Sequence, residues 1–77
     1  LKIARQCASA GNVCCAVMNG ANEEAVVAFL RDKIGICKIP DLIEVALDAV
    51  PTVYQPQLSD ILEADRRARE VVRARLN

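Results

Sequence analysis

Three carboxylates, Asp41, Glu44 and Asp48, have the spacing in this sequence that most readily suggests chemistry. At intervals of three and four residues they fall on one face of a helix, where oxygen ligands can gather a hard cation such as Mg²⁺. No second carboxylate-bearing segment obviously converges on that face, and amphipathic helices commonly carry a solvated acidic face. We therefore interpret the three acids as surface groups that meet arginines, and we predict no metal site.

Arg66, Arg69 and Arg73 form a basic stripe that could match those acids. Glutamate and aspartate residues are interleaved with the stripe, and no aromatic residue lies among the arginines to stack on a base. Ten Lys plus Arg balance ten Asp plus Glu, so the formal net charge is zero and the long-range field of a polyanion binder is missing. The sequence predicts no nucleic-acid partner.

The hydroxyl side chains lack a group that could activate them as nucleophiles. Histidine is absent, which removes His-based triads and imidazole metal ligands. No base neighbours the hydroxyl residues in sequence, and these are Ser9, Thr52, Tyr54 and Ser59. We predict that this chain contains no catalytic, cofactor-binding or metal-binding residue and that the 77 residues alone are not an enzyme.

Four cysteines, Cys7, Cys14, Cys15 and Cys37, allow two disulfides by count. A secreted disulfide framework would show denser cysteines and no helical patterning. The vicinal pair Cys14 and Cys15 also lacks the two-residue spacer of a redox motif or of half a zinc site. We interpret the cysteines as free, buried thiols that pack as small hydrophobic residues.

The first part of the chain predicts a helix over residues 1–10 that stops at Gly11 and Asn12. A short apolar run follows over residues 12–18 and is bounded by Asn19 and Gly20. Periodicity alone does not decide between a strand and an extended segment there. We predict a buried connector, because no second strand candidate exists to pair with it.

A second helix is predicted from Asn19 onward, with Asn19 or Asn22 as its cap. Glu23 and Glu24 would then lie in its first turn, where the helix dipole favours negative charge. The same polar group could suggest an active site, but it has no base or nucleophile nearby, so we interpret it as capping the helix. The pattern predicts that this helix ends near Asp32.

A third helix is predicted from a first turn that contains Pro40 to about Val50. Its expected buried face consists of Leu42, Ile43, Ala46, Leu47 and Val50. The stretch 51–56 contains two prolines and predicts a loop.

Ser59 is the expected cap of a fourth helix that continues through Leu76. Asp65 falls inside the apolar stripe of this helix, and Arg69, four residues on, is its predicted partner. The stripe is expected to be buried and consists of Leu58, Ile61, Leu62, Ala68, Val72 and Leu76.

Together these elements predict an all-α fold, a small bundle of about four helices, in which residues 1–77 form a single helical domain. No apolar window is long enough to span a bilayer, so we expect a soluble protein without a membrane partner. Hydrophobic residues make up 53% of the chain but aromatic residues only 3%. A core without many aromatic residues has small side chains and stabilises a small domain weakly. Docking against a partner would stabilise the fold further. Because the chain starts with Leu1 and not Met, we expect it to be part of something longer.

The segment Val17–Leu30, VMNGANEEAVVAFL, resembles the C-terminal helical domain of the 1-deoxy-D-xylulose-5-phosphate reductoisomerase family. Leu1–Ala4 is similar to the family's preceding helix, and residues 33–36 with Ile39 are similar to its following turn. Residues 61–65, followed by Ala68 and Arg69, are similar to its last helix. The likeness covers practically the whole chain, although Gly20 replaces a usual alanine and Cys14–Cys15 replaces small residues or proline.

The resemblance implies that a longer parent chain converts 1-deoxy-D-xylulose 5-phosphate to 2-C-methyl-D-erythritol 4-phosphate in non-mevalonate isoprenoid biosynthesis. It implies NADPH and a divalent cation, Mg²⁺ or Mn²⁺, as cofactors of that parent enzyme, bound upstream of this segment. The implied role of residues 1–77 is structural support of the catalytic domain of the same chain. The family further implies a homodimer and a cytoplasmic location, or a plastid in a plastid-bearing organism. The alternative is an independent helical protein-interaction module with a polar exterior.

Overall fold

The computed structural model describes residues 13–51 and 53–76. Within those residues the chain forms three helices and no strand, in the order α2 (Cys14–Leu30), α3 (Lys38–Ala49) and α4 (Leu58–Leu76). The predicted all-α class is confirmed. The helix count is one lower than the four expected, and the helix predicted over residues 1–10 lies outside the described residues.

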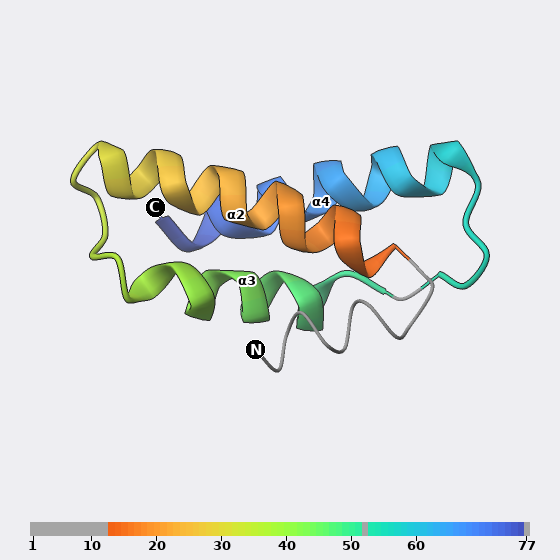
Figure 1. Cartoon of the computed structure of the whole chain (residues 1–77), viewed down its shortest axis with the longest axis horizontal. Coiled ribbons are helices and arrows are strands. Elements are labelled where there is room, and N and C mark those ends of the chain that lie inside the picture. The colour runs from red at the N-terminus through yellow and green to blue at the C-terminus, as the bar shows by residue number, and fades with distance from the viewer. Residues whose placement is uncertain (1–12, 52, 77) are drawn as a thin grey trace.

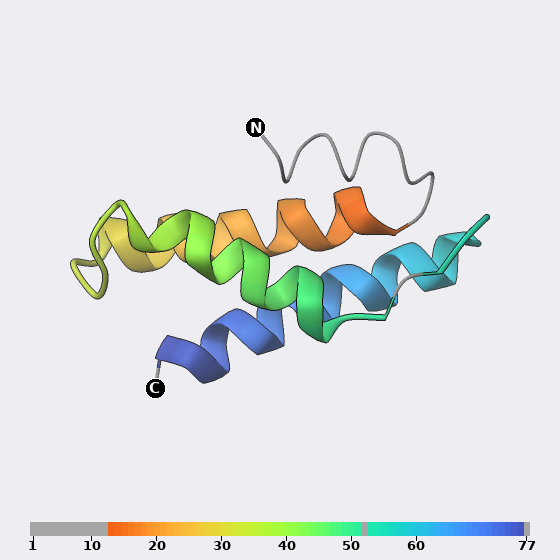
Figure 2. The same cartoon turned by 90° about the horizontal axis from the view of Figure 1, so that it is seen from below.

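The three helices pack side by side, and each contacts the other two. Figures 1 and 2 show that α2 and α4 run in the same direction, whereas α3 runs in the opposite direction. The loops that join α2 to α3 and α3 to α4 therefore lie at opposite ends of the bundle. This arrangement gives α2 and α4 a long shared seam and leaves the start of α4 beyond the start of α2.

α2 begins earlier than the sequence predicted. The buried connector expected over residues 12–18 is wrong, because the chain is helical from Cys14 onward. One face of this longer helix is apolar at helical spacing and almost fully buried, which drives the helix through Asn19 and Gly20 without a break. Its buried residues are Val17, Gly20, Ala21, Ala25 and Ala28.

The polar residues at the expected start of that helix lie in its interior. The N-cap residue is Val13, which makes no side-chain cap hydrogen bond. Asn19 and Asn22 are exposed on the middle of the helix, so the prediction that either residue caps it is wrong. Glu23 and Glu24 likewise lie far from the first turn, and their charges act on α4 instead.

α2 ends at Leu30, two residues before the predicted end at Asp32. The Lys33 amide donates to the Ala28 carbonyl at 2.9 Å, and the Asp32 amide donates to the Phe29 carbonyl at 3.0 Å. These two bonds form a Schellman motif, which requires a left-handed residue just after the helix. Asp32 occupies that position with φ of 60°, where glycine is the usual residue.

α3 follows the prediction closely. It runs over Lys38–Ala49, and Pro40 lies in its first turn, where a missing N–H removes no helical hydrogen bond. Leu42, Ala46 and Val50 are buried in the core. The remaining residues of the predicted face, Ile43 and Leu47, are partly buried and pack against that core.

α4 starts one residue before its predicted cap. Ser59 is the second residue of the helix, so the prediction of a Ser59 cap is wrong. The backbone amide of Gln57 instead donates to Asp60 Oδ2 at 2.9 Å, which is the reciprocal half of a capping box. The predicted loop precedes the helix, and Gln55 within it has a left-handed φ of 51°.

The core-facing side of α4 differs from the predicted stripe. Ala64, Ala68 and Val72 are buried, whereas Leu58 and Leu62 are 70% and 61% exposed. The predicted burial of Leu58 and Leu62 is therefore wrong, and Ile61 is also exposed. The helix thus turns its small residues towards the core.

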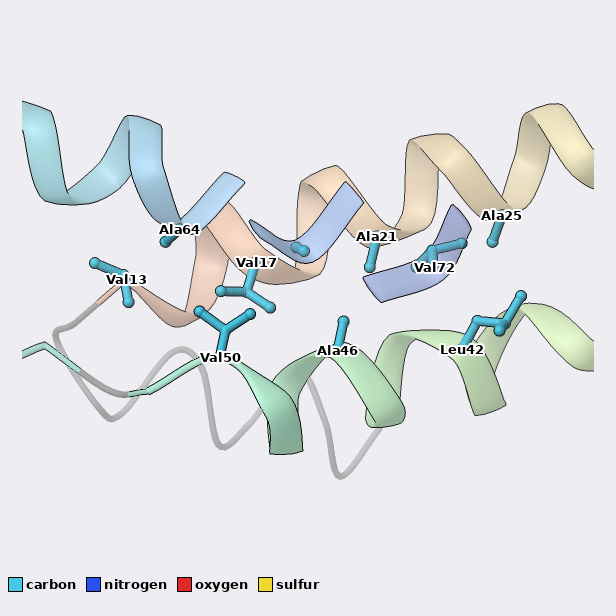
Figure 3. Close-up of a cluster of buried hydrophobic side chains, with 10 residues drawn as sticks. Val13, Val17, Ala21, Ala25, Leu42, Ala46, Val50, Ala64 and Val72 are labelled. Carbon is cyan, nitrogen blue, oxygen red and sulfur yellow. The ribbon is translucent and has the colours of Figure 1, made fainter. Parts of the chain in front are cut away.

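The core consists of small side chains throughout. Val17 and Val72 are the largest side chains that are fully buried among the described residues. Figure 3 shows valine and alanine from α2, α3 and α4 meeting at the centre, with Leu42 at one end. Such a core buries little apolar area per residue and stabilises the fold weakly by itself.

Candidate functional site

Gly20 of α2 faces Asp65 of α4 where these two helices lie close together. A Cβ atom added at Gly20 would lie 2.6 Å from Asp65 Oδ1 and 3.1 Å from the Asp65 carbonyl oxygen. Both distances are shorter than ordinary carbon–oxygen contact. A side chain at position 20 would therefore require Asp65 to shift, so Gly20 allows the close spacing of the two helices.

Arg69 lies next to this contact and binds carboxylates on both helices. Its Nε donates to Asp65 Oδ2 at 3.0 Å, and its Nη2 donates to Glu23 Oε2 at 2.6 Å. Its Nη1 reaches Glu24 Oε1 at 3.4 Å. The predicted Asp65–Arg69 pair is thus confirmed. The links to Glu23 and Glu24 join residues more than forty positions apart and were not predicted.

Arg73 completes the cluster one turn further along α4. Its Nη2 donates to Glu24 Oε1 at 2.6 Å, so Glu24 accepts from two arginines. The hydrogen bond from Arg73, and after it that from Arg69, lowers the pKa of Glu24 despite the opposing effect of burial. The hydrogen bonds that Arg69 donates to Asp65 and Glu23 raise the pKa of Arg69. We call these five residues the seam cluster, and they are Glu23, Glu24, Asp65, Arg69 and Arg73.

Arg66 makes ion pairs of a different kind. Its Nε and Nη2 both donate to Glu63 at 2.7 Å, and its Nη1 donates to Glu70. All three side chains are more than half exposed and lie on α4 alone. The hydrogen bond from Arg66 lowers the pKa of Glu63, but the pairs tie α4 only to itself.

The acidic face of α3 is not part of either cluster. Asp41, Glu44 and Asp48 are exposed as predicted. The described residues contain no ion pair between them and an arginine. The prediction that these acids meet the arginines of α4 is therefore wrong, because the arginines pair within α4 and with α2. Across the described ranges, no group of three His, Cys, Asp or Glu side chains gathers that could hold a metal ion.

The cysteines also differ from the prediction. Cys15 and Cys37 are free but exposed, and Cys14 is disulfide-bonded. The expectation of free thiols is confirmed for Cys15 and Cys37 and wrong for Cys14, the expectation that Cys15 and Cys37 are buried is wrong, and Cys7 lies outside the described residues. The helical phase explains the exposure of Cys15, since the buried face of α2 passes through Val17 and Ala21.

Large apolar side chains gather at the end of the bundle where α4 begins. Tyr54 and Leu58 are each 70% exposed. This end projects past the first turn of α2 (Figures 1 and 2). We call it the α4 overhang, and its exposed apolar residues are Val53, Tyr54, Leu58, Ile61 and Leu62.

The opposite end of the bundle has both apolar and charged side chains. Leu30 and Ile36 are exposed there, next to a shallow hollow of about 210 Å³. Three cationic side chains, Arg31, Lys33 and Arg73, help to line the hollow. Of the helices described, none has the length and apolar character needed to cross a membrane.

Comparison with known proteins identifies the relatives of this domain. The profile of the DXP reductoisomerase C-terminal domain family matches residues 1–71. The 1-deoxy-D-xylulose 5-phosphate reductoisomerase of Pseudomonas putida strain F1 is 49% identical over 73 residues, which cover 95% of this chain and 18% of that protein. The enzymes of Synechococcus sp. strain CC9605 and Leptospira biflexa are 44% and 39% identical across all of this chain and 19% and 20% of their own lengths. The chain therefore spans about a fifth of the length of the curated relatives it matches.

Proposed function

The chain belongs to the family of DXP reductoisomerase C-terminal domains, and on that premise we propose that it braces the catalytic part of a reductoisomerase subunit. The reaction of the complete enzyme would be the conversion of 1-deoxy-D-xylulose 5-phosphate to 2-C-methyl-D-erythritol 4-phosphate. No residue of the 77 would take part in the chemistry or bind a cofactor. The domain would act by holding its neighbour in place.

The placement of apolar side chains carries this proposal. Leu30, Leu58, Leu62 and Tyr54 are exposed, whereas valine, alanine and a single leucine, Leu42, make up the buried core of the described residues. A self-sufficient domain of this size gains most by burying its largest apolar residues. Apolar side chains that the bundle leaves exposed would be buried by a neighbouring part of the same subunit, as inter-domain contacts within a chain commonly are.

The chemistry of the seam cluster supports a bracing role. Each of its carboxylates accepts a hydrogen bond from an arginine. For Glu24 these bonds lower the pKa, which favours the ionised form over one that could transfer a proton near neutral pH. What the cluster does well is to fix α4 against α2. A stiff helix pair is a suitable support for an adjoining catalytic domain.

The cofactors and assembly of the complete enzyme belong to the same proposal. NADPH and Mg²⁺ or Mn²⁺ would bind outside residues 1–77, and the subunit would form a homodimer. The enzyme would act in the cytoplasm, or in a plastid where the source has one.

The decisive experiment compares three proteins, namely the full-length chain, the same chain without residues 1–77, and the 77 residues alone. We expect the full-length chain to oxidise NADPH with 1-deoxy-D-xylulose 5-phosphate and Mg²⁺ or Mn²⁺. The shortened chain should lose activity through instability, and the 77 residues should be inert. If the native protein has no chain beyond these residues and is inert, the independent interaction module becomes the better description.

A further inference from the structure

We propose that the α4 overhang, and not the opposite end of the bundle, is the face against which the remainder of the same reductoisomerase chain packs. The inference rests on the proposed function, because it takes the occupant to be the parent chain outside residues 1–77. The relatives have about four fifths of their length outside the matched segment. A large covalently attached neighbour of the overhang would therefore be available.

Charge distinguishes the two ends of the bundle. No charged residue occurs from Ala49 to Ser59, the stretch that leads into the overhang. At the other end Leu30 is followed directly by Arg31, Asp32 and Lys33. The buried centres of protein interfaces are depleted of charge and enriched in tyrosine, and their rims are polar. The uncharged stretch with Tyr54 and Leu58 fits such a centre, and Asp60, Glu63 and Arg67, which line a hollow beside Val53, fit its rim. At the opposite end the charges follow Leu30 directly.

The shape of the overhang suits a fixed docking surface. Leu58 and Leu62 are one helical turn apart, so their side chains lie on the same side of α4. The bond from the Gln57 amide to Asp60 holds the first turn of the helix. The seam cluster then fixes α4 between Asp65 and Arg73. The two leucines are thus presented by a rigid element, which lowers the entropy cost of docking.

The small size of the patch favours a tethered occupant over a separate molecule. Interfaces between independent proteins need a larger area than these few side chains can supply. A segment of the same chain meets the patch at the high effective concentration that a covalent connection provides. A second copy of the domain would lack this advantage.

Site-specific photo-crosslinking in the full-length enzyme tests the proposal. Tyr54→p-benzoylphenylalanine places the probe in the overhang with little change of shape. Ile36→p-benzoylphenylalanine is the matched control, because Ile36 is 62% exposed at the opposite end. Illumination followed by peptide mass spectrometry identifies each crosslinked partner, and mixing isotopically labelled with unlabelled subunits separates crosslinks within one chain from those between chains.

We expect the Tyr54 probe to crosslink within one chain to a segment outside residues 1–77, at roughly ten times the yield of the Ile36 probe or more. Crosslinks between two subunits would overturn the proposal, as would equal yields from both probes or no crosslink from Tyr54. Oxidation of NADPH by the unmodified enzyme is scored separately. An active enzyme without the Tyr54 crosslink refutes this inference alone, whereas an inactive enzyme refutes the proposed function.

A second pair of variants gives an energetic readout. Leu62→Glu should make heat inactivation of the full-length enzyme about tenfold faster or more, since a carboxylate would enter an apolar contact. Leu30→Glu should change the rate less than twofold. Equal effects of the two variants would contradict the proposal. If Leu62→Glu does not fold, the crosslinking result still decides.

Discussion

One face of α4 meets two different environments along its length. From Asp65 onward this face lies against α2, and every charged group on it that faces α2 has a partner. Before Asp65 the same face carries Leu58 and Leu62, which are exposed, and α4 begins beyond the start of α2 (Figure 1). The packed part combines a glycine contact with ion pairs, whereas the projecting part has large apolar side chains and no partner within the described residues.

The difference teaches how a small bundle can be rigid with little apolar burial. Gly20 lets the two helices approach until the arginines of α4 reach the glutamates of α2. Small side chains beneath the ion pairs keep that distance short. Large apolar residues cannot enter so narrow a seam, so they remain where α4 runs past its neighbour.

The largest expected effect comes from filling the closest contact in the seam. Gly20→Val places a branched side chain against Asp65, and we expect a loss of about 2–3 kcal/mol in the free energy of unfolding. Urea denaturation followed by circular dichroism measures it. Gly35→Ala is the matched control, because nothing lies within 4 Å of an added Cβ there. A Gly20→Val protein as stable as the control would show that the seam is loose.

A second prediction separates ion pairs across the seam from those within α4. Arg69→Ala removes the partner of Asp65 and Glu23, and we expect it to lower the free energy of unfolding by about 1 kcal/mol. Arg66→Ala removes pairs that are exposed and local, so its effect should fall within measurement error. Urea midpoints of both variants test this. Equal losses would mean that the seam cluster has no special role in the packing of α2 on α4.

The pH dependence of stability sharpens the same distinction. Because the arginines lower the pKa of Glu24 in the folded state, the unfolded chain binds the proton more tightly. The stabilisation is therefore complete above the ordinary pKa of a glutamate and is lost as pH falls through the lowered pKa of the folded state.

Replacing the titrating group should remove this contribution. In the Glu24→Gln variant the melting temperature should fall less steeply between neutral pH and about pH 3 than in the unchanged protein. The corresponding change in the free energy of unfolding should be smaller than the loss expected for Arg69→Ala. Glu44→Gln, on the exposed face of α3, should keep the slope of the unchanged protein. An unchanged slope in Glu24→Gln would argue against the Glu24 pairs in solution.

The smallest expected effect lies at the end of α2, outside the seam. Asp32→Gly should stabilise the protein by about 0.5 kcal/mol, because glycine adopts the left-handed conformation without strain. Asp48→Gly makes the same exchange inside α3 and should destabilise by a few tenths of a kcal/mol. Differential scanning calorimetry can resolve the opposite signs. Destabilisation by Asp32→Gly would show that its carboxylate contributes to this turn.

The sequence was informative where local rules decide the structure. α3 could be predicted because Pro40 marks its first turn and because Leu42 and Ala46 repeat at helical spacing. The Asp65–Arg69 pair could be predicted for a similar reason, since both residues lie one turn apart on a single helix. Both features depend on neighbours within four positions along the chain.

Local rules of this kind do not predict contacts between distant parts of the chain. Asn19 and Gly20 are residue types that often mark the boundary of a helix. The helix nevertheless continues through them, and α4 packs against Gly20. A hydrophobic pattern favours burial of Leu62 over Ala64, because leucine is the more hydrophobic residue. In the structure the smaller Ala64 is buried and Leu62 is exposed. The partners of Glu23 and Glu24 lie on another helix, and nothing near them in sequence indicates it.

Because α2 and α4 run in parallel, the contact between Gly20 and Asp65 also affects the position of the start of α4. Sliding α4 by one helical turn, about 5.4 Å, would bring Arg69 or Ile61 opposite Gly20 in place of Asp65. The contact therefore fixes the axial register of α4, and with it the length by which Leu58 and Leu62 extend past α2. A substitution at Gly20 would therefore shift the overhang although Gly20 is not part of it. In this way Gly20 influences how far Leu58 and Leu62 extend past α2.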